Sequence, residues 1–201
     1  MLSLPKSTEL SKQLPKNAIY AKFQMNAAER AKIDADISRI TIVNEVTAAK
    51  VNIADGEQVK SFFVLLVALK KKNFEDKTLI TISKLIPQKM LLVLEYGGKA
   101  KLAIYHTKLM QTEWKKTEDL SIELKGLDMD AVWENIIVQI GNIQMEQGNT
   151  LNEQIAVDDQ RTKIQKQIDC LAKQARAEKQ PKKKFEIVKQ IKKWSAMYEK
   201  I

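Results

Sequence analysis

The sequence predicts an α+β fold: a mixed or antiparallel sheet of about five strands with helices packed on it, followed by a basic helical hairpin. Two observations indicate this fold. Apolar segments with strand and helix periodicity alternate up to about residue 148. Beyond that point, two apolar series recur at helical spacing. We therefore expect an extended N-terminal arm at 1–20, an α+β globular domain at 21–148 and a basic helical hairpin at 149–201.

The first third of the chain indicates an arm, a helix and two strands. Pro5 and Pro15 lie among polar residues, which discourages regular structure and predicts an arm on the domain surface. Asn26, followed three residues later by Glu29, predicts a capped helix over 26–38. Two strands are expected next, one with β-branched residues at 40, 42 and 46 and a central one over the apolar run 62–69.

The next part of the chain predicts two helices, a hairpin and a fifth strand. Helical spacing over 74–86 ends at Pro87. The segments 90–96 and 99–106 flank two glycines, which tolerate the positive φ of a tight turn and predict a β-hairpin. A fifth strand is expected at 120–124, and Asp128 is expected to cap a helix that carries Trp133.

Two helical seams predict the C-terminal hairpin. Lys179, Gln180 and Pro181 interrupt the helical pattern between them, and Pro181 is suited to the first turn of the second helix. The pattern allows the seams to pack against each other, against the α+β domain or against a second copy of the chain. The seam residues are Leu151, Ile155, Ile164, Ile168, Leu171 and Ala175 in the first helix and Ile187, Ile191, Trp194, Tyr198 and Ile201 in the second.

Charge and composition limit the classes of function. The chain has a net charge of +9, and residues 161–201 hold 13 Lys/Arg against 4 Asp/Glu, so this segment carries all of it. Such a segment attracts nucleic acid, an anionic membrane surface or an acidic protein. One cysteine, Cys170, and one histidine, His106, predict neither a disulfide nor a zinc site. With no apolar run near membrane-spanning length, we expect a cytoplasmic protein without membrane segments, cofactor or metal.

The sequence lacks the usual catalytic signatures and favours a non-enzymatic role. It contains no phosphate-binding glycine loop, no His-Glu-x-x-His and no Gly-x-Ser-x-Gly. One alternative is a divergent magnesium-dependent nuclease, because Glu123 and Lys125 match a Glu-x-Lys pattern and Glu95 and Asp119 could add carboxylates. This pattern also arises by chance, and strand alternation would simply place Glu123 and Lys125 in solvent.

The best candidates for polyanion binding are cations around the turn of the predicted hairpin. Clustered cations there would neutralise several phosphates and give salt-sensitive, largely sequence-independent binding. Lysine predominates over arginine, which favours diffuse attraction over bidentate base recognition. Trp194 and Tyr198 could stack on bases, but their seam positions favour packing. The candidates are Arg176, Lys179, Lys182, Lys183, Lys184, Lys189, Lys192 and Lys193.

Five short segments together resemble the bacterial domain of unknown function 4391 family over nearly the whole chain. They are Leu4-Pro5-Lys6, Asn52-Ile53-Ala54-Asp55-Gly56, Leu94-Glu95-Tyr96-Gly97-Gly98-Lys99, Leu127-Asp128-Met129-Asp130 and Gln180-Pro181-Lys182-Lys183-Lys184. The resemblance implies a prokaryotic protein of unassigned activity from neighbourhoods of helicases and DNA methyltransferases, similar to restriction or phage-defence loci. It assigns no catalytic residues.

We therefore expect an accessory or adaptor subunit of a bacterial DNA-processing or defence complex. The α+β domain would dock a larger partner of helicase or methyltransferase type, and the basic hairpin would contact that partner or nucleic acid. Two alternatives stay open: the magnesium-dependent nuclease, and a structural module that self-associates through its C-terminal helices in coiled-coil fashion.

Overall fold

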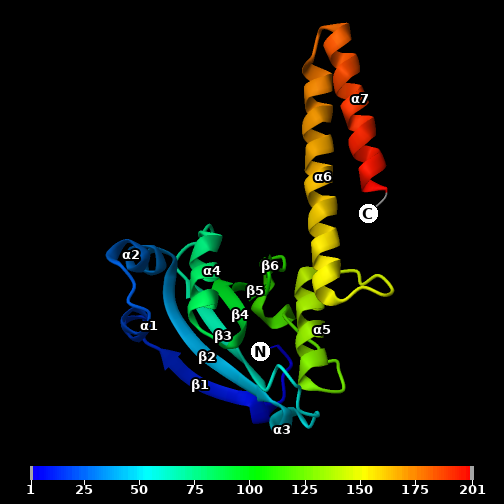
Figure 1. The fold of residues 1–201 in the computed structure, drawn as a ribbon. Helices are drawn as coiled ribbons and strands as arrows, with labels where there is room; N and C mark the ends of the chain where they lie inside the picture. Colours follow the sequence, from blue (N-terminus) through cyan, green and yellow to red (C-terminus); the bar gives the residue numbers. More distant parts are fainter. Residues whose placement is uncertain (1, 200–201) are drawn as a thin grey trace. The chain divides into compact units, whose positions relative to one another are not determined.

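A mixed β-sheet organises the first part of the chain (Figure 1). The fold is given by a computed structural model, which describes residues 2–199. It divides into two compact units, Met1–Ile143 and Gln144–Ile201, and each is described by itself. In the first unit, seven described strands form one sheet in the order β1-β2-β3-β4-β5-β6, with β7 also paired to β5. The strands are β1 (Glu9–Leu14), β2 (Ile37–Thr47), β3 (Ser61–Leu69), β4 (Lys89–Tyr96), β5 (Lys99–Tyr105), β6 (Leu109–Gln111) and β7 (Lys115–Lys116).

The strand pairs are antiparallel except for β3 and β4, which run parallel. A parallel pair needs a crossover connection, and α4 (Asp76–Leu85) provides it. The remaining helices of this unit are α1 (Lys16–Lys22), α2 (Ala27–Asp36), α3 (Ala48–Val51) and α5 (Met129–Gly141), with short 3₁₀ turns at Lys6–Thr8 and Thr117–Asp119.

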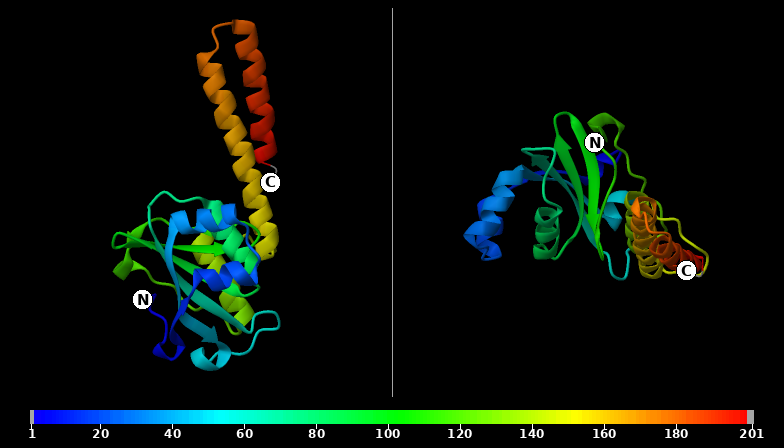
Figure 2. Two further views of the ribbon diagram at one scale, coloured as in Figure 1. Left: turned by 90° about the vertical axis from the view of Figure 1, so that its left-hand side faces the viewer. Right: turned by 90° about the horizontal axis from the view of Figure 1, so that it is seen from above.

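The helices cover both faces of the sheet. On one face, buried residues of α1, α2 and α4, including Ile19, Ile33 and Leu79, join a core cluster with residues of β2, β3 and β4. On the other face, Trp133 of α5 packs on Phe62 of β3, with ring centroids 5.2 Å apart. Figure 2 shows α4 and the N-terminal helices on one side of the sheet. The strand β3 is therefore central, as its uninterrupted apolar sequence predicts.

Local signals predicted several elements correctly. Asn26 and Glu29 form a capping box at the start of α2, in which each side chain accepts the other residue's backbone N–H. The Asp128 side chain accepts the N–H of Ala131 at the start of α5. Gly97 and Gly98 adopt φ of 56° and 73° in the β4–β5 turn, as the predicted hairpin requires.

The segment 1–20 is not an extended arm on the surface. It contains β1, which pairs with β2 and forms an edge of the sheet, and most of α1, whose Ile19 and Tyr20 are buried in the core. The prolines do not interrupt these elements because Pro5 precedes the first 3₁₀ turn and Pro15 is the residue before α1. At these positions, proline's missing N–H costs no strand or helix hydrogen bond.

The expected fifth strand at 120–124 is absent, and a sheet of about five strands underestimates the seven that are described. Ser121 forms only an isolated bridge with Leu2. Leu120 and Ile122 are buried nonetheless, so their alternation reflects the packing of an irregular segment. The helix predicted for 26–38 also ends early, at Asp36, because Ile37 already begins β2.

A buried carboxylate links α2 to the segment that follows β3. The side chain of Asp36 is 4% exposed and lies 2.8 Å from Lys71 Nζ. It also accepts hydrogen bonds from Thr78 Oγ1 at 3.0 Å and from the backbone N–H of Glu75 at 3.2 Å. Burial alone would raise the pKa of Asp36, but these hydrogen bonds to the charged form keep it below the ordinary value of 3.8. The ionised side chain of Asp36 therefore connects the end of α2 to the start of α4.

The second unit is a helical hairpin, as predicted. It consists of α6 (Leu151–Ala177) and α7 (Pro181–Tyr198), which pack against each other (Figure 1). Thr150 and Glu153 form a capping box that begins α6. Pro181 lies at the first turn of α7, where its missing N–H removes no helical hydrogen bond.

Candidate functional site

The short connection between α6 and α7 determines where the candidate cations lie. Residues 178–180 join the two helices, and the carboxylate of Glu178 accepts the backbone N–H of Gln180 at 2.8 Å. The helix α7 then starts directly at Pro181, so Lys182, Lys183 and Lys184 all fall in its first turns. The turn is built from local interactions and places these lysines at one end of the hairpin.

The apolar seam of the hairpin is more completely covered on α6 than on α7. Ile164, Leu171 and Ala175 of α6 are buried. No described residue of α7 is buried, and Ile187 and Trp194 of the predicted seam are only half-buried. A single partner helix therefore covers α7 incompletely.

All eight predicted cations are exposed, from Arg176 at the end of α6 to Lys193 on α7. Among residues 2–199, no ion pair joins any of these eight to a carboxylate. The first turn of α7 holds no acidic residue. Lysines there oppose the partial positive charge of the helix N-terminus, which normally favours Asp or Glu. The lysines and the helix terminus therefore give one concentrated region of positive potential.

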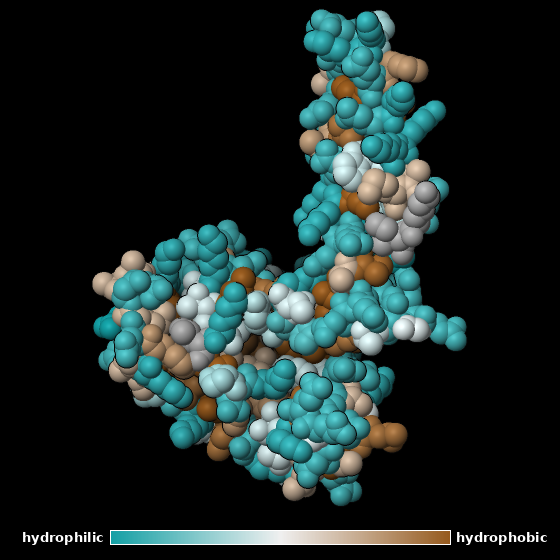
Figure 3. Space-filling model, in the orientation of Figure 1, coloured by the Kyte–Doolittle hydropathy of each residue, from teal (hydrophilic) through white to brown (hydrophobic). Residues whose placement is uncertain are grey.

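Sequence reasoning missed Phe185, Val188 and Met197 as exposed apolar residues of α7, although it considered Tyr198 for stacking on bases. Phe185 is 72% exposed, and Val188, Met197 and Tyr198 are also exposed. Phe185 lies two residues before Ile187 and so falls outside the helical spacing of the seam. This offset was the signal in the sequence that could have predicted its exposure. In Figure 3, hydrophilic residues cover most of the visible face of the hairpin, with hydrophobic residues between them. The cationic surface therefore includes apolar points of contact.

Comparison with known proteins shows the family of this chain. The sequence profile described as Domain of unknown function (DUF4391) matches residues 2–197. The chain belongs to this family. The DUF4391 match includes most of both compact units, so the hairpin is part of the family's sequence pattern. No curated protein and no solved structure matches the chain significantly.

The four residues of the nuclease alternative are not gathered into a group of three or more possible metal ligands within residues 2–199 of this DUF4391 protein. Glu95 lies near the end of β4, Asp119 in the second 3₁₀ turn, and Glu123 in the irregular segment after it. Glu123 forms an ion pair with Lys125. No group of three or more His, Cys, Asp or Glu residues within 2–199 could hold a metal ion. The expected convergence of carboxylates is therefore not observed.

The remaining sequence candidates occupy ordinary positions in the DUF4391 fold. His106 follows β5 and is half-buried, and its backbone N–H bonds to Lys108 O at 3.1 Å. Cys170 is exposed on α6. Trp194 is half-buried in the seam, whereas Tyr198 is 38% exposed. No helix within the described residues is long and apolar enough to span a membrane.

Proposed function

We propose that this DUF4391 protein is a non-enzymatic accessory subunit of a bacterial DNA-processing or defence complex that binds nucleic acid through its basic hairpin. One observation carries the proposal. Eight exposed cations lie on the hairpin and form no ion pair with any carboxylate in the described part of the chain, and three of them lie in the first turns of α7 against the preference of the helix dipole. Uncompensated positive charge lowers the stability of an isolated helix, so its concentration here is better explained by a polyanionic ligand.

Nucleic acid suits this surface because its phosphates repeat along the backbone. Lysine is a flexible point charge and does not require one fixed geometry of acceptors. We expect non-specific backbone binding, with sequence choice left to a larger partner of helicase or methyltransferase type that docks on the α+β unit. The family resemblance motivates this part of the proposal.

A salt titration tests the proposal. Fluorescence polarisation of the full-length chain with labelled double-stranded DNA should give a linear fall of log K with log salt, with a slope of about −0.9 for each phosphate neutralised. Single-stranded DNA should give about −0.7 for each contact. Absence of binding at low ionic strength would reject nucleic acid as the ligand and direct attention to an acidic protein.

The incomplete cover of α7 favours a second candidate function, self-association through the hairpin. Its exposed apolar residues, Phe185 and Val188, would become buried if a second copy added its helices. Sedimentation velocity should then show a mass that rises with protein concentration and falls for Phe185→Ser with Val188→Ser. A monomer at every concentration would dismiss this candidate without affecting the nucleic-acid proposal.

A further inference from the structure

Two cavities flank the connection between α4 and β4 in the α+β unit. Residues 86–88 form this connection, with Pro87 at its centre and a hydrogen bond from Gln88 N to Ile86 O at 2.8 Å. On one side is an apolar cavity of about 220 Å³ beneath α1. On the other side is a polar cleft of about 430 Å³. Ile86 and Gln88 line both, so the two spaces adjoin at this connection.

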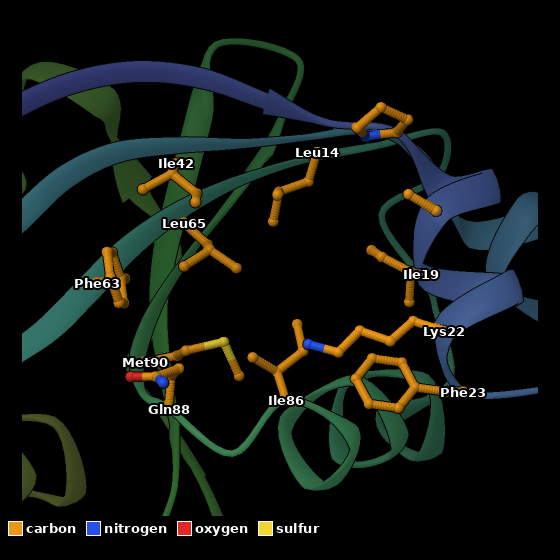
Figure 4. Close-up of a pocket in the computed structure, with 12 residues that line it drawn as sticks. Leu14, Ile19, Lys22, Phe23, Ile42, Phe63, Leu65, Ile86, Gln88 and Met90 are labelled. Carbon is orange, nitrogen blue, oxygen red and sulfur yellow. The ribbon is translucent and has the colours of Figure 1, made fainter.

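The walls of the cavity beneath α1 are almost entirely hydrocarbon. Figure 4 shows Leu65, Phe63 and Met90 from the sheet facing a space that Ile19 of α1 closes from the other side. Lys22 extends across this space toward Ile86 and brings a cation to it. A buried water needs several polar partners, and these walls offer few. The cavity therefore suits an apolar group.

The neighbouring cleft is cationic. Lys60, Lys84 and Lys89 line it with the hydroxyl groups of Ser61, Ser83 and Tyr105, and no Asp or Glu is among its lining residues. Lys60 Nζ donates to Gly56 O at 2.6 Å, and Lys84 Nζ lies 5.5 Å from the centroid of the Tyr105 ring. Neither contact neutralises the ammonium group, and the second holds that of Lys84 beside Tyr105, which also lines the cleft.

The carboxylate of Asp130 interacts electrostatically with Lys60 and reduces the positive potential around it. It is already engaged: the backbone N–H groups of residues 57–59 all donate to it, at distances from 2.6 Å upward. Lys84 lies in the last turn of α4, where the helix C-terminus favours a positive charge. Three lysines against this one carboxylate leave the cleft with a net positive potential.

We propose that the two cavities together bind a free single-chain amphiphile. Its alkyl chain would lie beneath α1, and its carboxylate or phosphate head would lie among Lys60, Lys84 and Lys89. The polarity of the walls favours this orientation, because the cleft offers a charged head three lysines and several polar side chains, whereas the largely hydrocarbon cavity offers only Lys22. The proposal does not depend on the hairpin.

Isothermal titration of the full-length protein with hexanoate, octanoate, decanoate and dodecanoate, each below its micelle concentration, tests the proposal. Affinity should increase about fourfold for each added methylene until the cavity is full, and then level off. Octyl phosphate should bind like octanoate because the heads share their charge. Octyltrimethylammonium should bind at least about tenfold more weakly, because its head would meet three lysines.

Two alanines of α1 give a matched pair of variants. Ala18 and Ala21 are both exposed, but only Ala18 lines the cavity. Ala18→Trp should fill the cavity and reduce decanoate affinity at least about tenfold, whereas Ala21→Trp should bind like the wild type. Lys84→Gln with Lys89→Gln should weaken octanoate but not octanol. Circular dichroism verifies folding.

Several outcomes would overturn the proposal. An affinity that does not change with chain length would show that the alkyl chain does not bind in the apolar cavity. Equal binding of the anionic and cationic amphiphiles would show that the three lysines do not contribute to the binding site. Wild-type affinity in Ala18→Trp would place the ligand elsewhere. If no alkyl carboxylate binds, the cavity would instead be suited to an apolar side chain of a protein partner.

Discussion

Replacing Lys179, Lys182, Lys183 and Lys184 with glutamine is expected to make DNA binding by the full-length chain much weaker and less sensitive to salt. If each lysine neutralises one phosphate, the slope of log K against log salt should become less steep by about 3 to 4. Affinity near physiological salt should fall by on the order of tenfold or more. These side chains are exposed, and glutamine is a good helix former, so the fold should be retained.

The matched control removes the same charge from the α+β unit. Lys6, Lys12, Lys72 and Lys77 are exposed there, and their replacement by glutamine gives the same net charge as the hairpin variant. A wild-type slope in this control and a reduced slope in the hairpin variant would locate binding on the hairpin. Equal reductions would show that the overall charge of the protein, and not the hairpin, attracts DNA.

Asp36→Ala is expected to give a large loss of stability. The substitution removes the acceptor of buried Thr78 and of the backbone N–H of Glu75, and also the partner of Lys71. A buried donor without a partner costs about 1–3 kcal/mol, so we expect the free energy of unfolding to fall by about 2–4 kcal/mol near neutral pH. Urea denaturation measures this change, with Asp55→Ala, at an exposed position, as the control.

The effect of Asp36→Ala should also depend on pH. In the folded protein the pKa of Asp36 is lower than the ordinary value of 3.8, so the unfolded chain takes up the proton first as pH falls. The ionised carboxylate therefore contributes its full stabilisation above about pH 4, and this contribution is lost as pH falls through the folded pKa. The difference between wild type and variant should narrow below about pH 4. A constant difference would mean that the charge of Asp36 is not the source of its effect.

Strong local signals made much of the fold predictable from the sequence. The apolar run of β3, the glycine pair at 97 and 98 and the cap at Asp128 each specify an element without distant contacts. The strands that sequence reasoning missed have no such local signals. β1 is mostly polar, and β6 and β7 contain three and two residues, so only pairing with β2 or β5 defines them.

The candidate sites also differ in how far local sequence predicts them. The hairpin cations are close together in sequence, so their clustering and exposure could be inferred from spacing alone. The cationic cleft could not be inferred, because Lys60 and Lys84 are far apart in the chain and meet only through the crossover from β3 to β4. Its apolar neighbour was also hidden, because α1 belongs to a segment that the sequence indicated to be an arm.

The bulged edge strand β1 has a consequence for behaviour at high protein concentration. Unpaired backbone groups along a sheet edge can pair with another molecule, and a flat, apolar edge strand invites aggregation. In β1, the register with β2 shifts between Glu9 and Lys12, and Pro15 follows the strand directly. Extension of the sheet by a second chain is hindered by the irregular backbone of β1, by the charge of Lys12 and by Pro15. The same residues that obscured β1 in the sequence therefore help to keep this edge from joining molecules into fibres.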